Sequence, residues 1–295
     1  MPILPASLSR FARRSLLYLS LTGTLSLLPA HAQASPSSLQ AVLGSEVALV
    51  FDIDEGSVVY EKNSEDLRPI ASISKLMTAL VVAESGLPLD EVLTISDDDV
   101  DRMRHSRSRL AVGTRLTRGE MLHLALMSSE NRAANALGRH YPGGMPAFVR
   151  AMNDKARALG MRHSRFVEPT GLSSDNVATS RDLVKLLQAT NRHRLIRHYA
   201  TDDTEVFDVG RGRKLTYNNT NRLVKRADWD IQVSKTGFIN EAGRCLVMLT
   251  RIDDREMAIV LLNASGSYSR IGDALRIRKL VETAGQTLAM AGSGS

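Results

Sequence analysis

Residues 70–83 decide the fold, and they read Ile70-Ala-Ser-Ile-Ser-Lys-Leu-Met-Thr-Ala-Leu-Val-Val-Ala83. Apolar side chains fall on nearly every side of this stretch, which is typical of a helix buried all round. Lys75 is its only charge. Lysine is almost never fully buried without a partner, because removing an ammonium from water is costly. We therefore expect a buried helix from about Ser72 to Gly86, and we expect that Lys75 within it has a chemical function.

A serine stands three residues before this lysine. Side chains three apart in a helix lie on the same face, about 5 to 6 Å from each other, so Ser72 would bring a hydroxyl to the amine of Lys75. The other interpretation is a serine cap at the helix start and a lysine whose ammonium extends to solvent. A Ser-x-x-Lys pattern alone leaves both interpretations open.

The segments around this helix predict the remaining architecture. Strand-forming residues occur near both ends of the chain, whereas helical periodicity fills the middle. Predicted strands cover 46–51, 57–62, 231–236, 244–250 and 257–262, and further predicted helices cover 117–127, 146–159, 180–190 and 268–288. Strands at the two ends must pair to bury their faces. We expect a three-layer α+β fold: an antiparallel sheet from both chain ends (about 39–70 and 205–295), covered by the last helix, with an inserted helical subdomain (about 71–204).

Residues 1–34 have the features of a secretory signal peptide. Three arginines precede an apolar run at 15–28, and small residues at 29–34 have cleavage-type spacing. The run is shorter than the roughly 20 residues that span a bilayer, and an uncleaved N-terminal anchor is the alternative. We expect the leader to be removed and residues 35–295 to work, without a transmembrane anchor, in a bacterial periplasm.

Composition excludes several classes of function. The 295 residues are 43% hydrophobic, enough to bury a sizeable core, so a disordered chain is excluded. The net charge is +6 and aromatic residues make up only 4%, which argues against a nucleic-acid-binding protein. The seven histidines show no metal-ligand spacing, so we predict no metal and no cofactor. The single cysteine, Cys245, cannot form an intrachain disulfide, and we expect it in the core of a strand.

Two further short patterns stand out along the chain. Ser129-Glu-Asn131 follows an apolar segment, where serine and asparagine would ordinarily be helix caps. Lys235-Thr-Gly237 closes a predicted strand and puts a lysine on the face of its apolar residues. The alternative for this lysine is an edge-strand charge that discourages aggregation.

In this order, Ser-x-x-Lys, Ser-x-Asn and Lys-Thr-Gly form the set found in penicillin-binding proteins and class A β-lactamases. From about residue 39 to 270 the chain resembles the low-molecular-mass penicillin-binding proteins, the serine D,D-peptidases. Within them it is most similar to the D-alanyl-D-alanine endopeptidases of the penicillin-binding protein 7 type. The segments that carry the resemblance are Ile70–Ala79, Leu126–Ala134, Glu168–Ser173 and Ser234–Arg244.

This resemblance implies a peptidoglycan peptide stem as substrate and β-lactam antibiotics as covalent inhibitors. A serine hydroxyl needs an adjacent base to become a nucleophile, so we expect Ser72 to attack and Lys75 to take its proton. Burial and a second fixed cation, Lys235, would lower the pKa of Lys75. We expect Ser129 to pass a proton to the leaving amine and Asn131 to hold the substrate backbone.

The resemblance also implies the binding groups around the reacting carbonyl. The oxyanion hole would be formed by the backbone N–H groups of Ser72 and Phe238, and the absent side chain of Gly237 would leave room for the substrate. Thr236 and Arg270 would bind a substrate carboxylate. For Arg270 a solvated surface position is an equal alternative.

Three other functions compete with the endopeptidase: a D,D-carboxypeptidase, a class A-like β-lactamase and a noncatalytic β-lactam sensor. A β-lactamase needs a carboxylate that activates the deacylating water, and Glu168 does not lie in the form usual in those enzymes. The residues after Gly237 suffice for two strands and a helix, which favours the endopeptidase over carboxypeptidases with an extra β-domain and anchor. A basic stretch at 102–109 after acidic residues predicts a solvated loop. Tyr217-Asn-Asn219 is similar to the Tyr-x-Asn element of other serine β-lactamases. We do not assign it that role, because it stands too close to Lys235 for a helical subdomain to lie between them.

Overall fold

The computed structural model describes residues 43–210, 212–266 and 268–292, with side chains up to Thr283. The predicted signal peptide at 1–34 lies outside the described residues. Within them, every helix is too short or too polar to cross a membrane.

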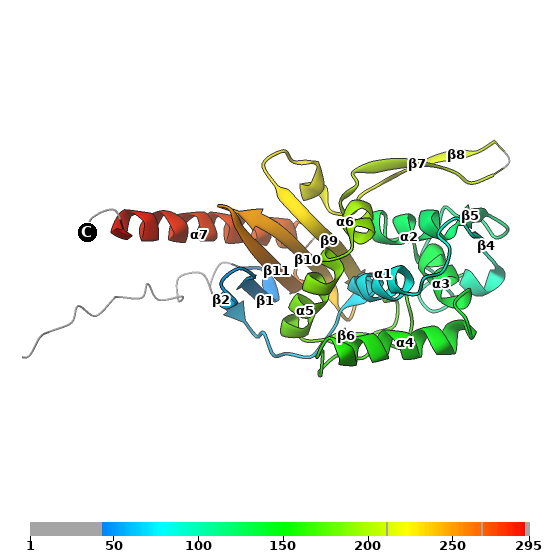
Figure 1. Cartoon of the computed structure of the whole chain (residues 1–295), viewed down its shortest axis with the longest axis horizontal. Helices are drawn as coiled ribbons and strands as arrows, with labels where there is room; N and C mark the ends of the chain where they lie inside the picture. Colours follow the sequence, from blue (N-terminus) through cyan, green and yellow to red (C-terminus); the bar gives the residue numbers. More distant parts are fainter. Residues whose placement is uncertain (1–42, 211, 267, 293–295) are drawn as a thin grey trace, which may run out of the picture. The chain divides into compact units, whose positions relative to one another are not determined.

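A five-stranded sheet forms the centre of the fold (Figure 1). Its strands are β1 (Ser45–Asp52), β2 (Ser57–Lys62), β9 (Asp230–Ile239), β10 (Gly243–Ile252) and β11 (Arg255–Ala264), in the spatial order β2-β1-β11-β10-β9. Every neighbouring pair is antiparallel, and β1 from the start of the domain pairs with β11 from its end. The predicted sheet from both chain ends is therefore confirmed.

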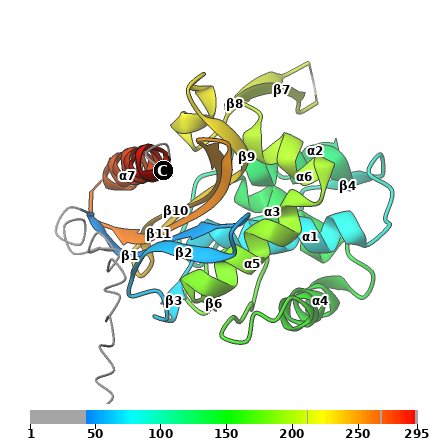
Figure 2. The ribbon, with the colours of Figure 1, turned by 60° about the vertical axis from the view of Figure 1, so that its left-hand side comes forward.

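Helices cover both faces of this sheet (Figure 2). The helix α7 (Ser269–Gly292) packs on one face, and α5 (Ser180–Asn191) packs on the other. The rest of the helical region holds η2 (Ala71–Ile73), α1 (Ser74–Glu84), η3 (Asp97–Asp99), α2 (Arg118–Met127), α3 (Asn131–Arg139), α4 (Gly144–Ala158), α6 (Arg194–Thr201) and η4 (Arg222–Lys225). Short strand pairs are β3 (Arg68–Pro69) with β6 (Val177–Ala178), β4 (Val92–Thr94) with β5 (Arg115–Thr117), and β7 (Thr204–Asp208) with β8 (Lys214–Asn218). This is the three-layer α+β arrangement that we expected.

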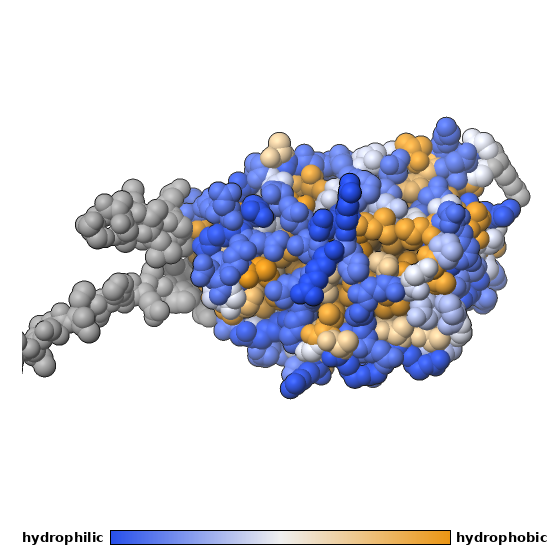
Figure 3. Space-filling model, in the orientation of Figure 1, coloured by the Kyte–Doolittle hydropathy of each residue, from blue (hydrophilic) through white to orange (hydrophobic). Residues whose placement is uncertain are grey.

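The two faces of the sheet belong to two separate cores. In β1, Val47 and Leu49 pack into the core of the helical region, while Ala48 and Val50 pack into the core beneath α7. Successive side chains of a strand point to opposite faces, so a strand buried on both sides is apolar at nearly every position. Figure 3, in the orientation of Figure 1, shows a mostly hydrophilic face with more hydrophobic residues on the side of the helical region.

Two of the boundaries that differ from the sequence predictions lie near the start of α1. The helix α1 starts at Ser74, because a 3-10 turn over Ala71–Ile73 precedes it. The strand β9 does not end at the Lys-Thr-Gly pattern but continues to Ile239, where the hairpin to β10 begins. Both differences fall next to Ser72, where strand and turn press against each other.

Candidate active site

Ser72 lies in a tightly enclosed turn at the start of α1. Ala71 just before it has a left-handed backbone, with φ of 48°, a conformation that costs energy for a residue with a side chain. A Cβ atom on Gly237 would lie 3.0 Å from the Ile70 carbonyl oxygen and 3.1 Å from the Ser72 nitrogen. The absent side chain of Gly237 thus lets β9 approach the serine's own backbone, whereas we expected it to make room for substrate.

A second glycine closes the turn from the other side. Gly171 has φ of 79°, and a Cβ atom on it would overlap the carbonyl group of Ala71. Backbone packed against backbone on two sides leaves little freedom to the turn. The Ser72 side chain remains partly exposed within this enclosure.

Lys75 is fully buried, and all three hydrogens of its ammonium have acceptors. Its Nζ lies 2.9 Å from the Ser72 Oγ, 2.7 Å from the Asn131 Oδ1 and 2.6 Å from the Thr170 carbonyl oxygen. The sequence interpretation of a lysine extending to solvent is therefore wrong.

Burial also changes the proton affinity of this amine. It lowers the pKa of Lys75 to about 8, while the carboxylates of Glu168 and Glu130 act in the opposite direction. A substantial fraction of Lys75 is therefore neutral at mildly alkaline pH.

Lys235 on β9 is buried as well, but its surroundings are different. Its Nζ donates to the Thr236 carbonyl oxygen at 2.9 Å. Burial holds its pKa well below the ordinary value, and the charges of Lys75 and Arg270 lower it further. We expected Lys235 to be a fixed cation that acts on Lys75. The structure places the charges of Lys75 and Arg270 near Lys235, whereas the carboxylates of Glu168 and Glu130 act on Lys75.

The turn between α2 and α3 carries the Ser129-Glu-Asn131 pattern. The Glu130 side chain accepts a hydrogen bond from the Arg132 nitrogen and so caps α3, which fixes Asn131 as the first residue of that helix. Asn131 is thereby brought to Lys75. Ser129 has a left-handed backbone with φ of 61°, and its hydroxyl makes no hydrogen bond within the described part of the chain.

The loop after α4 supplies a group that our sequence reasoning missed, the Thr170 carbonyl at Lys75. Glu168 organises this loop: its carboxylate accepts hydrogen bonds from the backbone nitrogens of Thr170 at 2.6 Å and Gly171 at 2.7 Å, and from the Thr170 hydroxyl at 2.5 Å. A carboxylate engaged in this way is not free to activate water. This agrees with setting Glu168 aside as a β-lactamase base.

Asn176 connects the same loop to the serine turn. It is fully buried, and its Nδ2 donates to the Ser74 Oγ at 2.9 Å and to the Glu168 carbonyl oxygen at 2.8 Å. Its own carbonyl oxygen accepts from the Ile70 nitrogen at 3.0 Å. No sequence pattern pointed to Asn176, because its partners are mainly backbone groups.

The binding residues expected on the other side of Ser72 lie along β9 and α7. The Thr236 hydroxyl bonds to the Thr220 hydroxyl at 2.7 Å, and the Phe238 side chain is 52% exposed under the Arg244 guanidinium. Arg270 points its Nη1 to the Gly237 carbonyl oxygen at a long 3.5 Å, and its Nε is buried without a partner among the described residues. Burial lowers the pKa of Arg270, so the solvated surface interpretation is not supported.

Tyr217 and Cys245, which we did not assign to the active site from the sequence, do not form a second catalytic site. Burial, together with Glu130, raises the pKa of Tyr217 to about 12, so its phenol is not a base near neutral pH. Burial also raises the pKa of Cys245 to about 11, as expected of a core residue. Within the described ranges, no three histidine, cysteine or acidic side chains gather as metal ligands.

The loop between β4 and β5, residues 95–114, which we name the strap, reaches the site. Its basic part at 102–109 is largely exposed, as we predicted, but it also contacts the site. The Ser106 Oγ accepts from the Asn131 Nδ2 at 3.0 Å, and Arg104 donates to the Leu172 carbonyl oxygen and pairs with Glu241 at 2.9 Å. A hollow of about 180 Å³ lies beside Asn131 and is lined by strap residues together with Thr170.

Comparisons with known proteins agree on one family. The profile of the peptidase S11 family, described as D-alanyl-D-alanine carboxypeptidase, matches residues 32–266. The chain is 49% identical over 253 residues to the D-alanyl-D-alanine endopeptidase of Pseudomonas aeruginosa, covering 85% of this chain and 81% of that protein. It is 46% identical over 255 residues to the Escherichia coli protein of the same name, covering 86% and 82%.

Solved structures extend this likeness to the fold. The Streptomyces K15 DD-transpeptidase superposes with a TM-score of 0.75 at 27% identity, covering 81% of this chain and 97% of that one. Penicillin-binding protein D2 of Listeria monocytogenes, in its cefotaxime-bound form, gives a TM-score of 0.68 at 27% identity, with the same coverage.

Proposed function

The chain belongs to the peptidase S11 family, and from this premise we propose that it is a serine D,D-endopeptidase that hydrolyses D-alanyl peptide cross-links of peptidoglycan. The observation that carries the proposal is the hydrogen bond of 2.9 Å between the buried amine of Lys75 and the Ser72 hydroxyl. The names of the P. aeruginosa and E. coli relatives support the endopeptidase activity over the carboxypeptidase activity.

The partners of Lys75 support its role as the base. A neutral amine has two N–H donors and one lone pair. Asn131 Oδ1 and the Thr170 carbonyl can only accept, so they take the two N–H groups. Ser72 is the one of the three partners that can donate a hydrogen, so the lone pair is directed at its hydroxyl.

The reaction then follows in two covalent steps. The Ser72 Oγ forms a bond to the carbonyl carbon of D-alanine while its proton passes to Lys75. The backbone N–H groups of Ser72 and Phe238 stabilise the negative oxygen of the tetrahedral intermediate. The C–N bond breaks, and the leaving amine gains a proton through Ser129. Water hydrolyses the resulting ester and returns a hydrogen to Ser72.

Charged groups beside β9 would bind the carboxylate end of the substrate. Thr236 and Arg270 would make this contact, and Asn131 would hold the peptide backbone. A bound carboxylate would raise the pKa of Lys235 and so favour its charged form. Lys235 would then help to hold the substrate.

The same site would react with β-lactams, which present a strained carbonyl to Ser72. The engaged state of Glu168 supports slow release of such adducts and so inhibition rather than antibiotic turnover. The leader at 1–34 supports export to the periplasm, with cleavage yielding a domain of residues 35–295.

The test is incubation of the purified protein with cross-linked muropeptide dimers and, separately, with pentapeptide monomers, followed by mass spectrometry. We expect dimers to be converted to monomers, and Ser72→Ala to abolish the conversion. Release of D-alanine from pentapeptides without dimer cleavage would establish the carboxypeptidase instead. Rapid nitrocefin turnover would establish the β-lactamase.

A further inference from the structure

An aromatic side chain with an arginine stacked on it stands exposed beside the site. Phe238, the residue after Gly237 on β9, is 52% exposed, although most apolar side chains of the central sheet are buried. The Arg244 guanidinium carbon lies over the Phe238 ring, 4.9 Å from its centroid. The two residues face each other directly in the β9–β10 ladder. A guanidinium over the face of a phenyl ring is a cation–π contact, so each side chain holds the other in place.

This pair lies on the face of the sheet that carries α7. Successive side chains of a strand point to opposite faces, so Thr236 and Phe238 share one face. Leu246, opposite Thr236 in the ladder, packs in the core beneath α7, which identifies that face. Gly237, between the two, approaches the Ser72 turn. Because β9 is the outermost strand of the sheet, the ring of Phe238 borders the same open edge as the reacting serine.

Two positive charges lie near each other on this face. Burial lowers the pKa of Arg270, and the charge of Arg244 lowers it further. The Nε of Arg270 is buried without a partner among the described residues, and its Nη1 lies at a long 3.5 Å from the Gly237 carbonyl oxygen. Neighbouring cations repel, and carboxylates relieve this repulsion. The face is therefore suited to a substrate that brings more than one carboxylate.

Cross-linked and uncross-linked substrates differ on this side of the scissile bond. In a pentapeptide the leaving group is a single D-alanine, whose one carboxylate Thr236 and Arg270 would bind. In a cross-link the leaving amine belongs to a diamino acid of a second stem, so further methylene groups and carboxylates follow. Methylene groups pack on an aromatic ring, and a guanidinium pairs with a carboxylate through two parallel hydrogen bonds.

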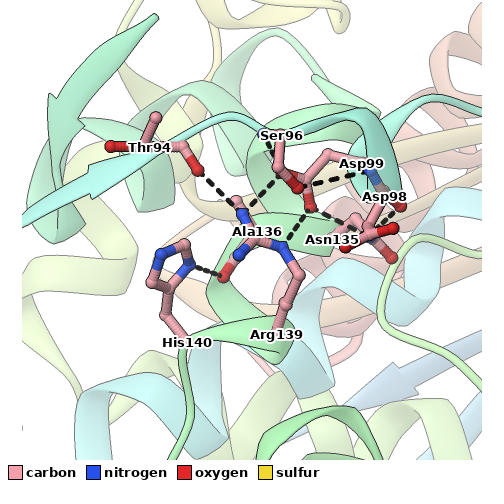
Figure 4. Close-up of polar contacts among 8 residues, drawn as sticks. All are labelled: Thr94, Ser96, Asp98, Asp99, Asn135, Ala136, Arg139 and His140. Carbon is pink, nitrogen blue, oxygen red and sulfur yellow. Dashed lines mark hydrogen bonds and ion pairs between the residues drawn. The ribbon is translucent and has the colours of Figure 1, made fainter. Parts of the chain in front are cut away.

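The hairpin that presents the pair is anchored to the rest of the site. Arg104 of the strap pairs with Glu241, in the turn between β9 and β10, at 2.9 Å. The strap is fastened in turn to α3, where Asp99 accepts from Arg139 at 2.8 Å and from Asn135 at 3.0 Å (Figure 4). A binding surface held in place in this way loses little freedom when a ligand docks on it.

We propose that the side chains of Phe238 and Arg244 form a subsite for the second peptide stem, and that this subsite makes the enzyme prefer cross-linked dimers to pentapeptide monomers. Methylene groups of the second stem pack on the Phe238 ring, and one of its carboxylates pairs with the Arg244 guanidinium. The inference rests on the proposed endopeptidase function. It adds a residue outside the three sequence patterns, Arg244, and gives a role to the side chain of Phe238, for which the resemblance implied only a backbone contact.

The test measures binding to Ser72→Ala protein, which holds substrates without cleaving them. Isothermal titration calorimetry gives the dissociation constants of a cross-linked muropeptide dimer and of a pentapeptide monomer. Adding Arg244→Gln should weaken dimer binding about tenfold, the size of one charge-assisted hydrogen bond, and so lower the ratio of dimer to monomer affinity. Adding Phe238→Leu keeps an apolar side chain but removes the cation–π contact, and it should lower this ratio about threefold.

Arg251→Gln is the matched control. Arg251 is another arginine of β10, and its Nε lies 3.9 Å from Asp230 at the start of β9. This substitution should leave the ratio of dimer to monomer affinity unchanged. Arg244→Lys keeps the positive charge and should retain part of the preference for the dimer.

A merely structural role of the stacked pair would weaken dimer and monomer binding equally. The proposal is overturned by that result, and also if Arg244→Gln leaves the ratio of dimer to monomer affinity at the value of the Ser72→Ala protein. Cleavage is scored separately with the protein that retains Ser72. Intact dimers there would contradict the proposed function, whereas the affinity ratio would still decide whether Phe238 and Arg244 bind the second stem.

Discussion

The two buried lysines of the site occupy regions of opposite character. Lys75, between α1 and the Thr170 loop, gives its three hydrogens to acceptors and lies near Glu168 and Glu130. Lys235, on the face of β9 that turns toward the helical region, has one carbonyl acceptor and lies near Lys75 and Arg270. The comparison teaches that burial alone does not define a base. The surrounding acceptors decide where a lone pair points, and the surrounding charges decide which amine keeps its proton longer.

The largest expected effect comes from removing the directed lone pair. Lys75→Met should lower the acylation rate about 10³-fold, the range that a general base contributes. The measurement is the rate of covalent labelling by fluorescent penicillin. Lys185→Met is the control, since Lys185 bonds to Asp182 and the Gly160 carbonyl oxygen. Labelling of the Lys75 variant at the control's rate would remove Lys75 from the base role.

Removing the other amine should have a smaller and different effect. Lys235→Met should lower muropeptide cleavage about 10²-fold, because a buried charge contact to a substrate carboxylate is lost. The loss should appear mainly as a higher KM. A variant that lost kcat as severely as the Lys75 variant, with KM unchanged, would mean that both lysines share one role.

The backbone around Ser72 offers a test of stability. Gly171→Ala should reduce the free energy of unfolding by about 3 kcal/mol, because the new Cβ overlaps the Ala71 carbonyl and the backbone is left-handed. Gly160→Ala is the matched control: its φ is 70° and no atom lies within 4 Å of the added carbon, so about 1 kcal/mol is expected. Denaturant unfolding measures both. Equal losses would show that the close approach is absent.

The pH dependence of the wild type tests the sign of the same claim without a substitution. Acylation requires the neutral amine, so the rate should rise with pH, about tenfold per unit, and level off above the Lys75 pKa of about 8. A rate that fell as pH rose from 6 to 8 would have the wrong sign for a lysine base.

Much of the site could be predicted from the sequence, and the reason is chemical. Ser72 and Lys75 were identifiable because a lone charge in an apolar helix needs a chemical reason and a hydroxyl stands one turn before it, whereas Asn131 followed from the resemblance to the family pattern. The sheet followed from alternating strands at both chain ends, and β1 does pair with β11.

The other parts of the site could not be predicted, because no residue type or pattern in the sequence indicated them. The Thr170 carbonyl is a backbone group that any residue could supply, so its contact depends on the loop conformation. Ser106 lies in a charged loop whose sequence indicated only solvation, and its position depends on distant anchors such as Asp99 with Arg139. The positive charge near Lys235 could be predicted only from the fold, because Arg270 at the start of α7 lies beside the Gly237 carbonyl oxygen of β9.

The most direct measurement is titration of the two amines by NMR of protein labelled at the lysine ε-carbons, with signals assigned by their loss in Lys75→Arg and Lys235→Arg. We predict that the Lys75 signal titrates near pH 8 and that the Lys235 signal also titrates well below the ordinary pKa of a lysine. A Lys75 amine that stays protonated beyond pH 10 would contradict its role as the base for Ser72.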